Sequence, residues 1–124
     1  MDHHLTKIEH IGIAVKSLED GNAMYTKILG VPPYKEEAVE SEGVRTSFFK
    51  AGPNKIELLE ATNPESPIAK FIEKRGEGIH HVAYAVEDIK TEMVRLEGEG
   101  FTLLNKEPKA GTDNKWVCFL QPKG

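Results

Sequence analysis

"EHIGIAV" at residues 9–15 returns as "HHVAYAV" at residues 80–86, so one short chain contains nearly the same stretch twice. When the two stretches are aligned, His10 meets His81 at a spacing of 71 residues. A helical pattern follows each copy, and extended segments follow each helical pattern. The repeat therefore predicts a unit of one strand, one helix and several strands that is present twice.

Local signals mark the elements of each half. In the first half the spacing predicts a helix from Leu18 to Leu29 that ends at Gly30, because glycine readily adopts the backbone conformation that ends a helix. In the second half Asp88 has the chemistry of an N-cap, and apolar residues recur at helical spacing after it. Extended segments are expected at 44–49 and 55–61, and again at 101–104 and 115–120.

Composition limits the classes of partner. The chain has 124 residues and a net charge of −4, which argues against a nucleic-acid or anionic-membrane partner. It contains no apolar run near the roughly 20 residues that a membrane helix needs. The polar N-terminal residues lack the apolar stretch of a signal peptide. Cys118 is the single cysteine, so it cannot form an internal disulfide, and we expect a cytoplasmic protein with a reduced thiol.

The two aligned histidines lie on sparsely filled strand faces. Side chains alternate along a strand, so His10 shares its face with Gly12 and Ala14, and His81 shares its face with two alanines. The opposite, bulky faces are expected to pack on the helices, as is the neighbouring His80. Two histidines that point into one cavity suggest a divalent-metal site. Two alternatives stay open: a hydrogen-bonded core histidine, and a duplicated histidine without a function.

A third candidate ligand is Glu57, in the apolar stretch "KIELLEA" at residues 55–61. A carboxylate in a mostly buried strand must be paired, protonated or bound to a cation. The alternative is an ordinary salt bridge on an edge strand.

Several longer stretches carry a resemblance to a known family. They are "HIGIAV" at 10–15, "GVRTSFF" at 43–49, "KIELLEA" at 55–61, "SPIAKFIEKRGEGIHHVAYAV" at 66–86 and "CFLQPKG" at 118–124. In these the chain resembles the vicinal oxygen chelate (glyoxalase-like) superfamily and, within it, the methylmalonyl-CoA epimerase family. The fold alone identifies no activity, because it serves many unrelated reactions.

The resemblance implies an α+β fold and a single domain over residues 1–124. Two pseudo-symmetric βαβββ units, at about 6–62 and about 78–124, would form curved mixed sheets around a central cavity. A linker helix at about 66–76 would join them, with Ser66 as its N-cap and proline at its first position. The second unit is expected to be incomplete, because its counterpart of "FFKAGPNKIELLE" begins at "CFLQPKG" and is cut short.

The resemblance also implies a site and an activity. It makes His10, His81 and Glu57 the ligands of a divalent metal, cobalt first, with manganese, nickel or zinc as alternatives. Family members invert the carbon between the carboxylate and the thioester of methylmalonyl-CoA. A cation would stabilise the enolate formed when the α proton leaves, and inversion needs a base and an acid on opposite faces. We therefore expect an acyl-CoA substrate and a homodimer.

Two departures from the family pattern leave the acid and base unassigned. The family's final strand supplies a glutamate ligand and base, which this sequence does not show. A second acidic base lies three residues after the glycine that matches Gly43, and here that position is Thr46. An impaired enzyme is therefore expected for the chain as it stands, and Thr46, Phe48 and Lys109 are candidate substrate contacts. The alternatives are a glyoxalase-type lyase or isomerase acting on a glutathione thiohemiacetal, and a non-catalytic small-molecule-binding protein.

Overall fold

A computed structural model describes residues 5–111 and 115–121 of the chain. By spatial contact the chain divides into two compact units, one of residues 7–84 and one of residues 85–124 together with 1–6. The sequence repeat has a different boundary, near residue 78, and its partition into two equivalent units stays a prediction. The expectation that the second repeat is incomplete falls on residues 122–124, which lie outside the described residues.

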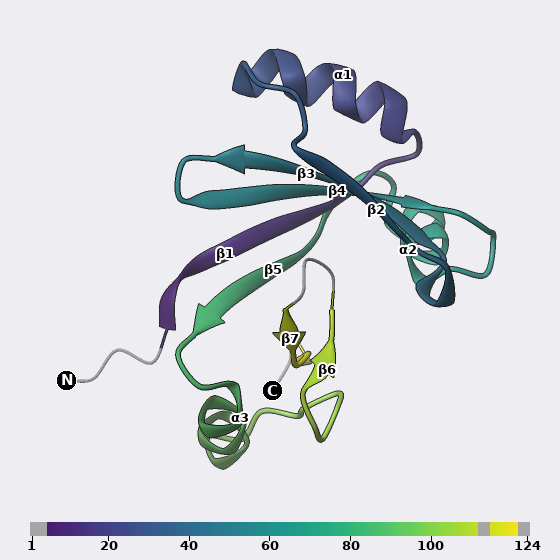
Figure 1. Ribbon diagram of the computed structural model, residues 1–124. Helices are drawn as coiled ribbons and strands as arrows, with labels where there is room; N and C mark the ends of the chain where they lie inside the picture. The colour runs from purple at the N-terminus through teal and green to yellow at the C-terminus, as the bar shows by residue number, and fades with distance from the viewer. Residues whose placement is uncertain (1–4, 112–114, 122–124) are drawn as a thin grey trace. The chain divides into compact units, whose positions relative to one another are not determined.

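The unit of residues 7–84 contains the whole first repeat. Its elements are β1 (Leu5–Ala14), α1 (Leu18–Leu29), β2 (Lys35–Val39), a 3-10 helix η1 (Glu40–Glu42), β3 (Val44–Ala51), β4 (Asn54–Ala61), α2 (Pro67–Arg75) and β5 (Gly78–Val86), of which β1 and β5 each extend two residues beyond the unit. The strands form one mixed, curved sheet in the order β2-β3-β4-β1-β5 (Figure 1). β1 runs parallel to β4, and β2, β3 and β4 are antiparallel neighbours. The predicted α+β fold, with a strand–helix–three-strand first repeat, is confirmed.

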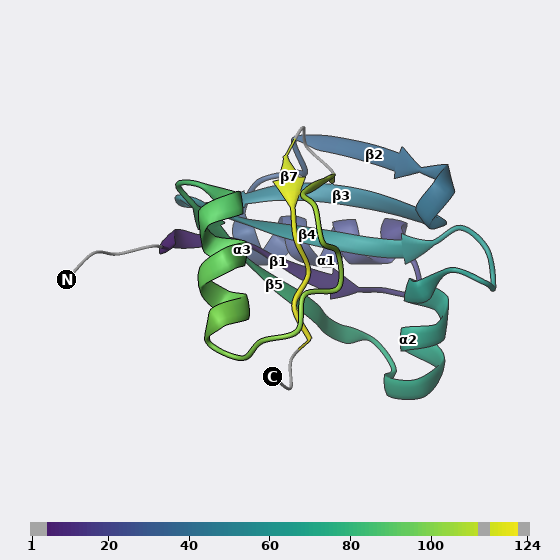
Figure 2. The ribbon, with the colours of Figure 1, turned by 90° about the horizontal axis from the view of Figure 1, so that it is seen from below.

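The main hydrophobic core lies between this sheet and α1, which covers one face (Figure 2). Val15, Leu18, Phe49 and Leu58 are buried there, and Tyr25 of α1 packs against them. The spacing of apolar residues along α1 and the alternation along β3 and β4 place these side chains on one shared surface.

A second core lies where α2 meets the other face of the sheet. Ile68 of α2 is buried with Ala14 of β1 and Leu59 of β4. The hydroxyl of Ser66 accepts a hydrogen bond from the backbone N–H of Ala69 at 3.1 Å, with Pro67 at the first helical position, as predicted. α2 therefore covers one end of this face.

The predicted bounds of α1 and the predicted start of α3 (Ile89–Gly98) after Asp88 are also confirmed. α1 ends at Gly30, whose φ of 76° lies in the left-handed region that suits glycine. Asp88 caps α3 by accepting from the backbone N–H groups of Lys90 and Thr91. Within the described ranges, every helix is too short or too polar to cross a membrane.

The strands predicted at 101–104 and 115–120 are largely wrong. The structure has a two-stranded sheet of β6 (Lys109–Ala110) and β7 (Trp116–Val117), and a single bridge between Leu103 and Leu120. Ladders persist where a neighbouring strand supplies partners along their whole length. In residues 101–111 and 115–121 only these short pairings form, and local propensity alone does not extend them.

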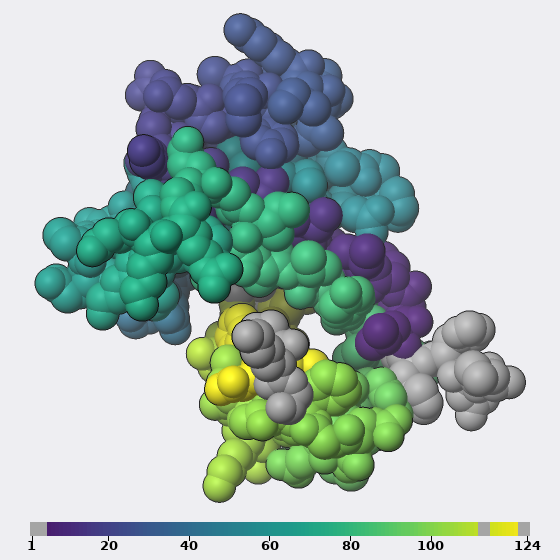
Figure 3. Space-filling model, turned by 180° about the vertical axis from the view of Figure 1, so that it is seen from behind, coloured from purple at the N-terminus to yellow at the C-terminus, as the bar shows by residue number. Residues whose placement is uncertain are grey.

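The bulky face of β5 also differs from expectation. Ile13 of β1 packs against the α1 core, as predicted, but Val82 and Tyr84 of β5 are 41% and 56% exposed. β5 lies at the end of the strand order, whereas α1 contacts β3 and β4. Figure 3 shows the surface of α2 in teal and of β5 in green on one face of the molecule.

Candidate functional site

The two repeated histidines meet in the structure. Nε2 of His10, on β1, lies 2.9 Å from Nε2 of His81, on β5. Their ring centroids are 5.1 Å apart, with the ring planes at 86°. The open face that the repeat predicts for both strands therefore brings the two imidazoles together edge to face.

Gly12 makes room for this arrangement. A Cβ atom at Gly12 would overlap Cε1 of His81 and would lie 2.7 Å from both ring nitrogens. Gly12 is also the register partner of Glu57, which in turn pairs with Phe48. Phe48, Glu57, Gly12 and the His81 ring therefore form a row across β3, β4, β1 and β5. The missing side chain at Gly12 is what lets the His81 ring settle over β1.

Glu57 is the buried carboxylate of this row, with only 3% of the residue exposed. Its Oε2 lies 3.2 Å from Nδ1 of His10. A negative carboxylate beside Nδ1 favours the tautomer of His10 that carries its proton there and leaves a lone pair on Nε2. β4 is an interior strand, so the alternative of an edge-strand salt bridge does not fit Glu57.

His80 contacts the cluster from the other side. Its Nδ1 lies 3.0 Å from Nδ1 of His81, and its ring packs edge to face on Phe71 of α2 at a centroid distance of 4.9 Å. His80 packs on a helix, as expected, but the helix is α2, which packs on Ala14 and not on the face of Val82 and Tyr84. Sequence reasoning also missed its contact with His81. The usable signal was the adjacency of two histidines on a strand at the edge of a sheet.

The environment keeps the second-repeat imidazoles neutral. Burial, then the neighbouring His10 and His80, lower the pKa of His81 to about 4. Burial also lowers the pKa of His80. Near neutral pH both rings therefore have one protonated and one lone-pair nitrogen, and a neutral imidazole is the form that binds metal ions.

The histidine pair fits a divalent cation better than the full predicted triad does. Two nitrogens each about 2.1 Å from one ion, at roughly a right angle, would be about 3 Å apart. The observed 2.9 Å between the Nε2 atoms matches that separation. The oxygen of Glu57, however, approaches Nδ1 of His10 rather than Nε2. Among the described residues no group of three His, Cys, Asp or Glu side chains is arranged to hold a metal ion.

The three candidate substrate contacts are divided between the two units. Phe48 is fully buried next to Glu57, and Thr46 lies on the same face of β3, two residues away. Thr46 is also fully buried, and its hydroxyl has no hydrogen-bond partner in the described part of the chain. Lys109 belongs to the other unit, where its Nζ lies 5.0 Å from the centroid of the Phe119 ring.

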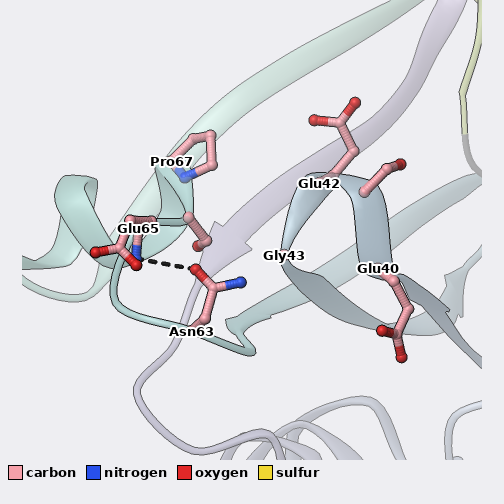
Figure 4. A pocket seen from close by; sticks show the side chains of 8 residues that line it. Glu40, Glu42, Gly43, Asn63, Glu65 and Pro67 are labelled. Carbon is pink, nitrogen blue, oxygen red and sulfur yellow. Dashed lines mark hydrogen bonds between the residues drawn. The ribbon is translucent and has the colours of Figure 1, made fainter.

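A hollow of about 270 Å³ lies away from the histidines, between η1 and the start of α2 (Figure 4). It is lined by Glu40, Ser41, Glu42, Gly43, Asn63, Glu65, Ser66 and Pro67. Glu40 and Glu42 are exposed on its rim, as expected for solvated carboxylates. The carboxylates of Glu40, Glu42 and Glu65 would repel the phosphates of an acyl-CoA, so this hollow is a poor candidate for the substrate site.

Several known proteins are similar to this chain in sequence and in fold. An ethylmalonyl-CoA/methylmalonyl-CoA epimerase of Cereibacter sphaeroides is 40% identical over 94% of this chain and 89% of its own length. A hypothetical protein from Bacillus halodurans C-125, whose structure is solved, is 44% identical with a TM-score of 0.90, covering 94% of this chain and 84% of that one. A methylmalonyl-CoA epimerase whose structure is solved with methylmalonyl-CoA and NH4+ is 33% identical, with a TM-score of 0.90. The match covers 96% of this chain and 87% of the epimerase chain.

The family description "Glyoxalase/Bleomycin resistance protein/Dioxygenase superfamily" matches residues 9–119, which include both histidine strands and Glu57. The resemblance inferred from the sequence is thereby confirmed. The chain belongs to the glyoxalase/bleomycin resistance protein/dioxygenase superfamily, and its relatives include methylmalonyl-CoA epimerases.

Proposed function

We propose that this chain epimerises methylmalonyl-CoA with the help of a divalent metal ion. The observation that carries the proposal is the meeting of His10 and His81, one from each repeat, with the buried Glu57 behind His10. The similarity to named epimerases supports the choice of substrate. Cobalt is the first choice of metal, with manganese, nickel or zinc as alternatives.

The chain's own residues prepare the site for this chemistry. His10 and His81 would hold the ion through Nε2, and Glu57 keeps a proton on Nδ1 of His10. When bound there, the cation would supply Lewis-acid stabilisation of the enolate that forms from the thioester. Phe48 forms an apolar, fully buried wall beside Glu57, which limits the access of water.

Thr46 occupies the position of an acidic base in the family but cannot act as the base itself. A threonine hydroxyl cannot take the α proton near neutral pH, because it is far too weak a base. A hydroxyl can instead donate a hydrogen bond to a carboxylate; Thr46 is fully buried, so its hydroxyl would reach the substrate only when the side chains around it move aside on binding. We therefore assign Thr46 to substrate binding, together with Phe48 and, more weakly, Lys109.

We also propose a homodimer that works in the cytoplasm. The exposed Val82 and Tyr84, on one face of the edge strand β5, give an apolar surface on which a second copy could pack. The single cysteine suits a reducing compartment. Light scattering of the purified chain measures the mass directly, and a monomer at micromolar concentration would contradict the homodimer.

The test is exchange of the α proton of methylmalonyl-CoA with solvent. The cobalt-loaded protein and the substrate are mixed in heavy water, and the α proton signal is followed by NMR. We expect metal-dependent loss of this signal, at the reduced rate of an enzyme in which Thr46 replaces an acidic base. Gly12→Ala should slow the exchange about 100-fold, because it displaces the His81 ring and small misplacements in a site have effects of that size. Gly98→Ala, where an added Cβ meets no atom within 4 Å, is the matched control.

Other outcomes would favour the alternatives. Exchange-free but tight binding of the acyl-CoA would indicate a non-catalytic binding protein. Turnover of a glutathione thiohemiacetal without exchange of methylmalonyl-CoA would indicate a glyoxalase-type lyase or isomerase. Either result would refute the epimerase proposal.

A further inference from the structure

The contact between His80 and His81 requires one shared proton. Two Nδ1 atoms 3.0 Å apart repel each other when both carry lone pairs or both carry protons, so one ring donates and the other accepts. Side chains of consecutive strand residues leave on opposite faces, so this contact is not a by-product of strand geometry. Both rings turn toward each other, with their planes at 86° and their centroids 5.2 Å apart.

The position of His80 is fixed from outside the histidine cluster. Its ring packs on Phe71, which belongs to α2 and lies beside the core formed by Ile68, Ala14 and Leu59. α2 is in turn anchored by the Ser66 cap. His80 therefore holds its Nδ1 against His81 with the support of a packed helix.

The two directions of this hydrogen bond have opposite consequences at the His10–His81 pair. If His80 donates, a neutral His81 carries its proton on Nε2, where it can donate to Nε2 of His10 across 2.9 Å. If His81 donates, its Nε2 is left with a lone pair that faces His10. In the metal-free protein the first arrangement gives the Nε2 atom of His10 a hydrogen-bond donor, since Glu57 favours the proton of His10 on Nδ1. The second is the one that a cation requires.

We infer that His80 is a positioning residue whose Nδ1 accepts a hydrogen bond from Nδ1–H of His81 when a cation is bound, and donates to His81 when it is not. On cation binding the proton of His81 moves from Nε2 to Nδ1, and the proton of His80 moves from Nδ1 to Nε2. Both rings stay neutral, so no proton is gained or lost. This inference rests on the metal site in the proposed function but not on the reaction.

Two substitutions separate this role from simple packing. His80→Phe keeps an aromatic ring on Phe71 but removes the nitrogen. His80→Asn loses most of the ring contact but retains a side-chain oxygen that can accept from His81. Loss of an outer hydrogen-bond partner of a metal-binding histidine typically weakens metal affinity about 10–100-fold. We expect that loss in His80→Phe, and affinity within a few-fold of the original in His80→Asn, even if the latter is less stable to urea.

The measurement is calorimetric titration of the whole chain with zinc chloride, with nitrogen-15 NMR of the histidine rings before and after zinc. The expected spectra show the His81 proton on Nε2 without zinc and on Nδ1 with zinc. Three results would overturn the inference: equal zinc affinity in His80→Phe and the original chain, a weaker affinity only in His80→Asn, or no change of tautomer at His81. Absence of α-proton exchange with normal zinc behaviour would instead count against the epimerase alone.

Discussion

The strands after the helix of the first repeat are built into a sheet that a helix covers, whereas the described residues after the helix of the second repeat form only short strand pairings. Phe48 and Phe119 both lie in the segment that follows the helix of their repeat, and a lysine Nζ lies 4.8 Å and 5.0 Å from their ring centroids. Phe48 is nevertheless fully buried, while Phe119 is 42% exposed. The same residue type with the same local contact therefore has a different burial because its strand neighbours differ.

The largest difference in the free energy of unfolding should come from replacing Phe48 and Phe119. Phe48→Ala is expected to lower the free energy of unfolding by about 3–5 kcal/mol, the usual result for a buried phenylalanine. Phe119→Ala should lower it by less than about 1 kcal/mol, because surface substitutions have small effects. Urea unfolding followed by circular dichroism measures both. Similar losses would show that the second repeat is packed as tightly as the first.

An intermediate effect is expected from the histidines, because their surroundings also differ between the repeats. His10 lies beside a carboxylate, while His81 is partly buried between two imidazoles. Burial first, and the two imidazoles second, lower the pKa of His81 from 6.5 to about 4. In the metal-free protein the unfolded chain therefore binds a proton at His81 at higher pH than the folded chain does. The contribution of the neutral His81 to the free energy of unfolding should be fully present above about pH 6.5. The free energy of unfolding should then fall by about 3 kcal/mol as the pH decreases to about 4.

The check is a series of urea titrations of chelator-treated protein between pH 7 and pH 4. His81→Gln cannot take up this proton and should flatten the slope in that window. An identical slope in the two proteins would mean that other groups carry the acid sensitivity.

The smallest effect concerns the helix caps, the feature in which the repeats agree. Ser17 and Asp88 are equivalent positions, and each caps its helix by accepting backbone N–H hydrogen bonds. Substitution of each by alanine should lower stability by about 1 kcal/mol. If α3 opens locally without global unfolding, Asp88→Ala will instead increase amide hydrogen exchange in α3 with little change in urea midpoint. A large loss at only one site would show that the two helices are not locally equivalent.

Sequence reasoning worked best where the controlling physics is local. The ends of α1, the Ser66 and Asp88 caps and the β3–β4 hairpin depend on residues a few positions apart, and all were predictable from spacing and capping chemistry. Strand alternation also placed His10 and His81 on the faces where they meet. The weak point was the region after α3, where strand length depends on partners that local sequence does not specify.

The sequence by itself determined the repeat, the helix boundaries and the residue types of the candidate site. Only the tertiary structure decided which nitrogen of each imidazole faces its neighbour, that Glu57 approaches Nδ1 of His10, and that His80 joins the cluster. It also decided that Val82 and Tyr84 are exposed although Ile13 is not. The reason is that ring orientation and burial depend on contacts between residues far apart in the chain, whereas periodicity reports only the face from which a side chain starts.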